Sequence, residues 1–95
     1  MRHIFLLGIL AVITAPAIAS TPAAWDELYS ATAKACLQKS GLKKPKIVEG
    51  PVLFSANILY RIRGTWPQPH MKGKTGKEYC LHPYPNGEPE IVEAR

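Results

Sequence analysis

The sequence is poor in the residues that carry most catalytic, redox and metal chemistry. It has two cysteines, three histidines and seven acidic residues in a chain of 95 residues. Neither cysteine belongs to a Cys-x-x-Cys pair, the spacing typical of redox and metal sites. No apolar run reaches the length of about 20 residues that a membrane-spanning helix needs. We therefore expect no catalysis, no cofactor and no stable insertion into a membrane.

The first 19 residues have the composition of a bacterial secretory signal peptide. Arg2 and His3 form a short basic start, residues 4–14 are an almost unbroken apolar run, and residues 17–19 have the small-x-small form that signal peptidase cuts. The residue directly after the cut site is Ser20 and not a cysteine, so a lipid anchor is not indicated. The alternative is an uncleaved membrane anchor. We expect cleavage after Ala19 and a periplasmic or secreted protein.

Cleavage would leave residues 20–95 as a single small domain of 76 residues, the 95 of the chain less the 19 removed. Loss of Arg2 leaves 11 basic and seven acidic residues, a net charge of +4. Eight of these basic residues fall into two groups, one after the predicted helix and one around a later loop: Lys43, Lys44 and Lys46, then Arg61, Arg63, Lys72, Lys74 and Lys77. This charge permits weak contact with anionic envelope polymers but does not predict nucleic-acid binding.

The two cysteines, Cys36 and Cys80, both lie in residues 20–95. Two cysteines in a small exported domain most often form a disulfide, and the alternative is a reactive or metal-binding thiol. A bridge that closes a loop of this length stabilises the fold by about 4 kcal/mol in the chain-entropy model. We predict a Cys36–Cys80 disulfide.

Residues 22–40 predict one helix. Thr21 suits the N-cap, Pro22 the first helical position, and Gly41 the position that ends the helix. The side chains expected on the buried face recur with helical spacing: Trp25, Leu28, Tyr29, Thr32 and Cys36.

After Lys46 the pattern becomes that of strands. The expected strands are 46–49, 57–63, 78–84 and 90–93. Gly50-Pro51 predicts a break after the first of them, followed by a second short apolar run at 52–54, and in 57–63 Ile58, Tyr60 and Ile62 alternate onto one face. Asn86-Gly87 predicts a two-residue hairpin turn before the last strand, and the prolines around it predict that this hairpin lies at a sheet edge. The expected fold class is α+β, with one N-terminal helix packed on a three- to four-stranded antiparallel sheet and linked to it by the disulfide.

This order of elements, with its final Asn86-Gly87 turn, is similar to that of the small secreted PepSY-type domains. More loosely, it resembles the helix-on-sheet fold of several periplasmic inhibitor proteins. The resemblance covers most of residues 20–95 as an order of elements and implies a helix on a sheet. No family motif accompanies it, so it assigns no residue a role. Residues 65–77 form a longer insertion than such a domain needs.

The tripeptide Gly73-Lys74-Thr75 has the spelling that ends a phosphate-binding loop, yet it does not predict a nucleotide site. The motif GxxxxGK[ST] requires a glycine five residues earlier, where Gln68 stands. It also requires a preceding strand and a following helix. Here the preceding residues are rich in proline and a strand is expected to follow.

Residues 64–77 predict a long loop, and loops of this length in small domains tend to be functional or disordered. Trp66 stands in this segment beside Pro67 and near three lysines, Lys72, Lys74 and Lys77. A large aromatic residue with basic neighbours is typical of a recognition hot spot. The alternative is that Trp66 folds back and covers the small core.

The sequence offers candidate residues for two further kinds of site, a metal site and a catalytic site. His70 and Met71, with His82 as a third ligand if the loop folded over the sheet, would suit copper, and the alternative is an ordinary polar loop. For catalysis, three carboxylates cluster near the terminal hairpin without the apolar enclosure that a general acid needs: Glu88, Glu90 and Glu93.

Alternation along the strand at 78–84 predicts an exposed apolar patch. If Cys80 faces the helix, Tyr79 and Leu81 face the other side, together with Leu59. The alternative is that the long loop covers them. We therefore expect a binding protein for another protein of the envelope or medium, such as an inhibitor or accessory module of an enzyme. Its expected contact is Trp66 with the Pro-, Gly- and Lys-rich loop, and the open face of the sheet is expected to support that contact. The alternatives are a copper-handling protein and an envelope-polymer-binding protein.

Overall fold

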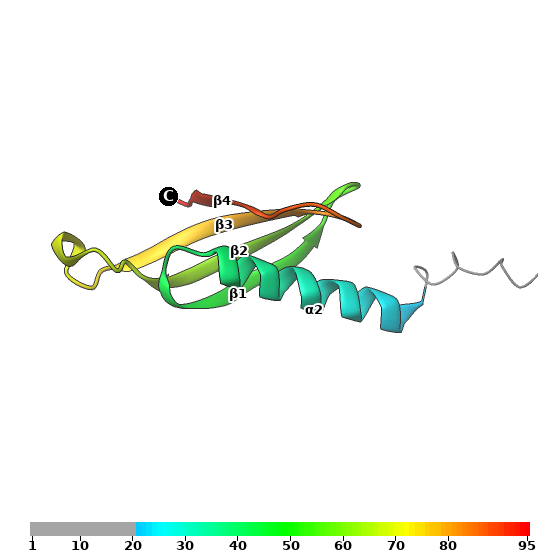
Figure 1. Cartoon of the computed structure of the whole chain (residues 1–95), viewed down its shortest axis with the longest axis horizontal. Helices are drawn as coiled ribbons and strands as arrows, with labels where there is room; N and C mark the ends of the chain where they lie inside the picture. Colours follow the sequence, from blue (N-terminus) through cyan, green and yellow to red (C-terminus); the bar gives the residue numbers. More distant parts are fainter. Residues whose placement is uncertain (1–20) are drawn as a thin grey trace, which may run out of the picture.

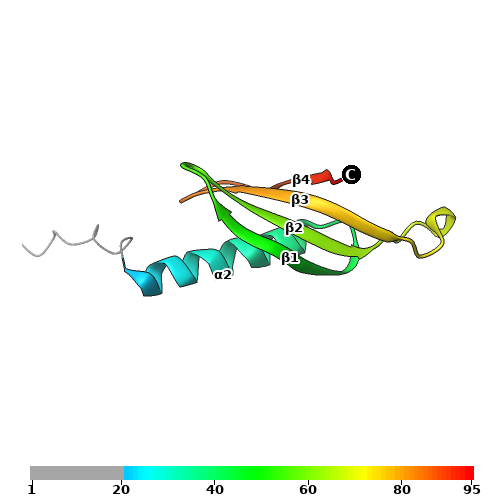
Figure 2. The ribbon, with the colours of Figure 1, turned by 180° about the vertical axis from the view of Figure 1, so that it is seen from behind.

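The computed structural model describes residues 21–95, so the expected signal peptide and its cleavage site lie outside the described residues. Helix α2 (Pro22–Lys39) is followed by four strands: β1 (Lys43–Leu53), β2 (Asn57–Thr65), β3 (Thr75–Pro83) and β4 (Glu90–Glu93). The strands form one antiparallel sheet in chain order. The helix lies along one face of this sheet (Figures 1 and 2). The predicted α+β fold is confirmed.

The helix begins where the sequence predicts and ends one residue earlier. The Thr21 hydroxyl accepts a hydrogen bond from the backbone N–H of Ala24 at 3.0 Å, and Pro22 takes the first helical position. The helix ends at Lys39, where the backbone N–H of Ser40 donates to the carbonyl of Cys36. Cap residues satisfy the backbone groups that have no partner within a helix.

The core lies between the helix and the inner sides of β2 and β3. Alternate side chains of these strands are buried: Ile58, Tyr60, Ile62, Glu78, Cys80 and His82. Cys36 on the helix and Cys80 on β3 are both fully buried and form the predicted disulfide, with their Cα atoms 5.9 Å apart. The disulfide thus joins the helix to an inner strand of the sheet.

Strand β1 runs through Gly50-Pro51, where the sequence predicts a break. Its pairing with β2 shifts register between Lys43 and Lys46, between Ile47 and Glu49, and between Glu49 and Val52. Such bulges let an edge strand continue past residues that cannot pair. Gly50 has φ +114°, and a Cβ there would lie 2.6 Å from the carbonyl oxygen of Leu59. The break predicted from Gly-Pro was therefore wrong, because the strand absorbs it as an irregularity.

The predicted loop at 64–77 was too long. Strand β2 extends to Thr65 and β3 begins at Thr75, which leaves 66–74 with one turn of 3₁₀ helix, η3 (Pro69–Met71). Gly64 and Gly76 pair directly with each other. A Cβ at Gly76 would lie 2.7 Å from the Trp66 ring, so this glycine permits close packing rather than loop flexibility.

The two-residue hairpin predicted at Asn86-Gly87 was also wrong. Leu81 pairs with Glu90, and residues 84–89 form the connection between β3 and β4. Proline residues in this stretch have no N–H to donate to a ladder, which prevents pairing up to a tight turn. The prediction that this hairpin lies at a sheet edge is confirmed, since β4 is the last strand.

A buried carboxylate holds the end of the helix to the sheet. Glu78 is 4% exposed and accepts hydrogen bonds from the Ser40 hydroxyl at 2.6 Å and from the Gly41 backbone N–H at 3.1 Å. We expect Glu78→Ala to lower the free energy of unfolding by about 1–3 kcal/mol, because both donors lose their acceptor. Urea denaturation measures this change.

The matched control is Glu93→Ala. Glu93 is the cross-strand partner of Glu78 on β4 but is exposed, so its loss should change the unfolding free energy by less than about 0.5 kcal/mol. Equal effects of the two substitutions would contradict a capping role for Glu78.

Candidate functional site on the open face of the sheet

The face of the sheet turned away from α2, which we call the open face, has no described element over it (Figures 1 and 2). The loop at 66–74 extends beyond the end of the sheet and does not fold across this face. Antiparallel register sets the side chains of the open face in rows that run across the strands. These rows differ in chemistry from one end of the sheet to the other.

The first region is the apolar end, formed by side chains from all four strands: Val52, Leu59, Tyr79, Leu81 and Val92. Leu81 is 36% exposed and Val92 50%. A hollow of about 430 Å³ lies here, lined by Leu59, Tyr79, Leu81, Glu90 and Val92. Contiguous exposed apolar side chains often mark a site of association.

The second region is the cation row. Lys46 on β1 pairs in register with Arg63 on β2, and Arg63 pairs with Lys77 on β3. All three residues are exposed. Like charges placed directly opposite one another destabilise a sheet. The cation row therefore places three like charges side by side and does not stabilise the sheet.

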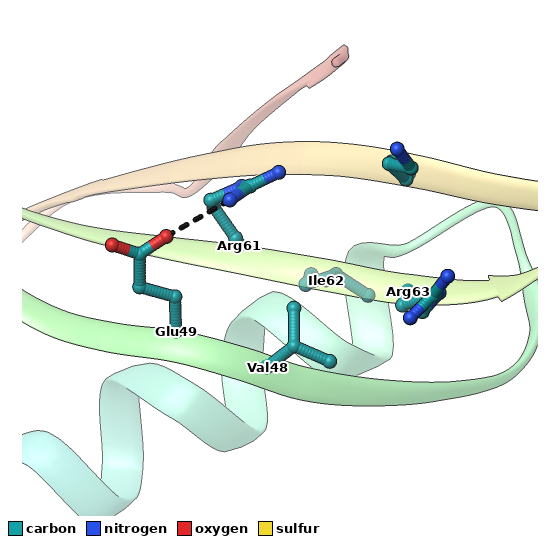
Figure 3. A pocket seen from close by; sticks show the side chains of 6 residues that line it. Val48, Glu49, Arg61, Ile62 and Arg63 are labelled. Atoms are coloured by element: carbon teal, nitrogen blue, oxygen red, sulfur yellow. Dashed lines mark hydrogen bonds and ion pairs between the residues drawn. The ribbon is translucent and has the colours of Figure 1, made fainter. Parts of the chain in front are cut away.

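A hollow of about 280 Å³ lies beside this row, lined by residues of three strands: Val48, Glu49, Arg61, Ile62, Arg63 and Lys77. Figure 3 shows Arg61 and Glu49 joined by an ion pair, with Arg63 further along β2 and α2 behind the sheet. Their closest atoms, Nη1 of Arg61 and Oε1 of Glu49, are 3.0 Å apart. This Arg61–Glu49 pair is the one salt bridge within the part of the chain that the structure describes, residues 21–95.

Arg61 separates the cation row from the apolar end. Its guanidinium carbon lies 5.7 Å from the centre of the Tyr79 ring, a cation–π contact, while it also pairs with Glu49. Both partners of the ion pair are substantially exposed, so the pair contributes only about 0–1 kcal/mol to stability. The charge of Arg61 nevertheless has partners within the fold, which distinguishes it from Arg63.

The residues predicted to bind are divided between two places. Tyr79, Leu81 and Lys77 lie on the open face, where alternation placed Tyr79 and Leu81. Lys72 and Lys74 are exposed in the loop at 66–74.

Trp66 differs from these residues because it is half-buried and packs against the core cluster. This agrees with the alternative in which Trp66 covers the core. A contact between Trp66 and a partner stays a prediction.

Sequence reasoning did not bring Lys46 together with Arg63 and Lys77, and it did not include Val92 in the apolar patch. Lys46 belonged to the first basic group and the other two to the second. No local pattern could have joined them, because their proximity depends on the register of three strands.

The residues considered for copper lie at opposite ends of the sheet. His70 and Met71 are in the loop at 66–74, whereas His82 is buried near the end of β3 with Nδ1 2.6 Å from the carbonyl oxygen of Pro83. His82 lies seven positions along β3 from Thr75, roughly 23 Å of strand. The loop does not bring the three together. Among residues 21–95 no group of three or more His, Cys, Asp or Glu is placed to hold a metal ion.

A further apolar hollow, of about 520 Å³, lies between the start of α2 and the end of β3. Trp25 and Tyr84 line it, with their ring centres 6.0 Å apart. The chain enters α2 beside this hollow, and the residues before Thr21 lie outside the described range. We therefore assign no site to it.

Within residues 21–95 no helix has the length and apolar character needed to cross a membrane. No family model matches the chain, no curated protein matches its sequence and no solved structure matches its fold.

Proposed function

We propose that this is an exported, non-catalytic binding protein whose contact surface for another protein is the open face of the sheet. The observation that carries the proposal is the apolar end, where Val52, Leu81 and Val92 are exposed, Leu59 and Tyr79 are half-buried, and no described element lies over them. Burial of such side chains on association is favourable by about 25 cal/mol per Å² of apolar surface.

The Cys36–Cys80 disulfide and the signal-like start of the sequence support export to the periplasm or the medium. The two carboxylates of the open face, Glu49 and Glu90, are exposed, and Glu49 pairs with Arg61. Neither is enclosed as a general acid or base usually is, which favours binding over catalysis. An inhibitor or accessory module of an envelope or extracellular enzyme fits these features.

The proposal is tested by chemical cross-linking in the native envelope, with the full chain expressed so that it is exported. We expect Leu81→Asp to reduce capture of the partner at least tenfold, because it introduces a charge at the centre of the apolar end. Captured proteins are quantified by mass spectrometry.

The matched control is Ser30→Asp, which adds the same charge at an exposed position of α2. It should capture the partner as the unmodified protein does. Circular dichroism and thermal melting establish that both variants are folded. Undiminished capture by a folded Leu81→Asp variant, or no partner in any preparation, contradicts the proposal; loss of capture in Trp66→Ala alone would move the contact to the loop at 66–74.

A further inference from the structure

We propose that the open face binds an acidic, amphipathic protein segment, with apolar side chains on the apolar end and carboxylates on the cation row. This inference rests on the proposed function and states the chemistry of the partner. It follows from the two regions of the open face and from their separation along the strands.

The cation row determines the charge of the partner. Lys46, Arg63 and Lys77 are exposed and adjacent in register, and the one salt bridge of residues 21–95 lies in the next row. A partner that covered these side chains without offering anions would bury unpaired charge, which is strongly unfavourable. A partner with carboxylates would instead pair with them and reduce their mutual repulsion.

The apolar end determines the rest of the contact. Its hollow is lined mainly by apolar groups of Leu59, Leu81 and Val92 and by the Tyr79 ring. Exposed apolar surface of this kind gains little from a purely charged ligand, such as a polyanion or a free phosphate. A segment with both apolar and acidic side chains uses both regions.

A second copy of this chain is a poor occupant. Two open faces packed with their ends aligned would set one cation row against the other. Packed with their ends reversed, they would set each cation row over Val52, Leu59 and Leu81 of the other copy, where Glu90 is the one acidic group of that row. Both arrangements bury charge without adequate partners.

The edges of the sheet are less suited to a partner than its face. The β1 edge has three register shifts and contains Pro45 and Pro51, which cannot donate hydrogen bonds to an added strand. The β4 edge is a strand of four residues. Irregular and short edge strands discourage strand addition, so we assign the contact to side chains of the open face.

The separation of the two regions specifies the spacing in the partner. Arg63 lies four positions along β2 from Leu59, roughly 13 Å of strand. A helix laid along β2 covers this distance in about nine residues. We therefore expect acidic residues about two to three helical turns from the apolar residues of the bound segment.

The test uses a phage-displayed library of random 20-residue peptides, selected against protein that is expressed as the full chain and purified after export. We expect the selected peptides to be enriched in Asp and Glu and to contain a separate apolar group. For a synthetic copy of the most enriched peptide, we expect at least a tenfold loss of affinity with Leu81→Asp. The same loss is expected with the double variant Arg63→Glu/Lys77→Glu.

The matched control for charge is the double variant Lys34→Glu/Lys39→Glu, at exposed positions of α2. It makes the same change in net charge away from the open face and should alter affinity less than threefold. Affinity of the unmodified protein should also fall as salt rises, because exposed charges are screened. Arg63→Gln/Lys77→Gln should remove most of this dependence on salt.

Peptides without acidic enrichment, or binding that survives both open-face variants, would overturn the inference. So would equally strong binding to phosphatidylglycerol vesicles, or a dimer by sedimentation that Leu81→Asp dissociates. If cross-linking still finds a native partner that depends on Leu81, the proposed function stands while this inference fails. If neither a peptide nor a native partner is found, both fail.

Discussion

Replacement of Cys36 and Cys80 together by alanine is expected to lower the free energy of unfolding by about 4 kcal/mol. The bridge closes a loop with a sequence separation of 44 residues, and without it the unfolded chain gains conformational freedom. A small domain has a total stability of roughly 5 kcal/mol, so most of the margin would be lost. Urea denaturation followed by tryptophan fluorescence measures the change.

The reduced form of the unmodified protein is the matched control, because it has the same side chains without the bond. It should show nearly the same loss of stability as the double variant. A loss below about 1 kcal/mol in both would contradict the chain-entropy account for this fold. A large loss in the double variant alone would instead mean that packing of the sulfur atoms, which are fully buried, is the larger contribution.

Tyr60→Ala is expected to lower the free energy of unfolding by about 3–5 kcal/mol, the range for truncation of a buried aromatic side chain. Tyr60 is the largest fully buried side chain and lies on β2 against α2. Its hydroxyl donates to the Tyr29 carbonyl at 2.9 Å and lies 2.8 Å from the Thr32 hydroxyl. Thermal and urea denaturation of the two proteins measure the loss.

Tyr60→Phe separates the ring from the hydroxyl. It should cost only about 1–2 kcal/mol, because the ring still fills its place and Thr32 retains the Leu28 carbonyl as a partner at 2.9 Å. A cost for Tyr60→Phe as large as that for Tyr60→Ala would mean that the hydrogen bonds, rather than packing, dominate at this position.

The same pair of proteins has an expected pH dependence. Burial raises the pKa of Tyr60 above its ordinary value of 10.0. The folded protein therefore keeps the proton at a pH where the unfolded chain loses it, so this contribution to stability is complete below pH 10 and declines as pH rises further. The Tyr60→Phe variant has no ionisable hydroxyl at this position, so its free energy of unfolding lacks this decline with pH. The difference between the two proteins should therefore shrink as pH rises above about 10.

Much of the fold follows from local pattern. The Thr21-Pro22 start of α2, the alternation of Ile58, Tyr60 and Ile62, and the pairing of Cys36 with Cys80 were all predicted and are confirmed. Each depends on the preference of a few adjacent residues or on two buried cysteines with no other partner. These local preferences agree with the tertiary structure, so the folded protein keeps the local structures that they favour.

The predictions that failed all concern irregular pairing. The sequence predicts a break at Gly50-Pro51 and a tight turn at Asn86-Gly87, whereas β1 continues through the first and a six-residue connection, 84–89, replaces the second. Gly64 and Gly76 were read as parts of a loop but pair with each other where Trp66 packs close by. Glycine and proline in a sequence indicate that the backbone is irregular at that position. Whether the irregularity becomes a break, a turn or a bulge within a strand depends on pairing with the neighbouring strand.

The candidate site also has one part that the local sequence pattern predicts and one part that only the tertiary structure decides. Alternation along β3 was enough to set Tyr79 and Leu81 opposite Cys80, because side chains of a strand alternate between faces whatever the strand pairs with. The cation row depends instead on register across β1, β2 and β3, and a slip of one residue would turn Arg63 toward the helix. Residues 46, 63 and 77 meet only after hydrophobic burial on the other face has selected that register.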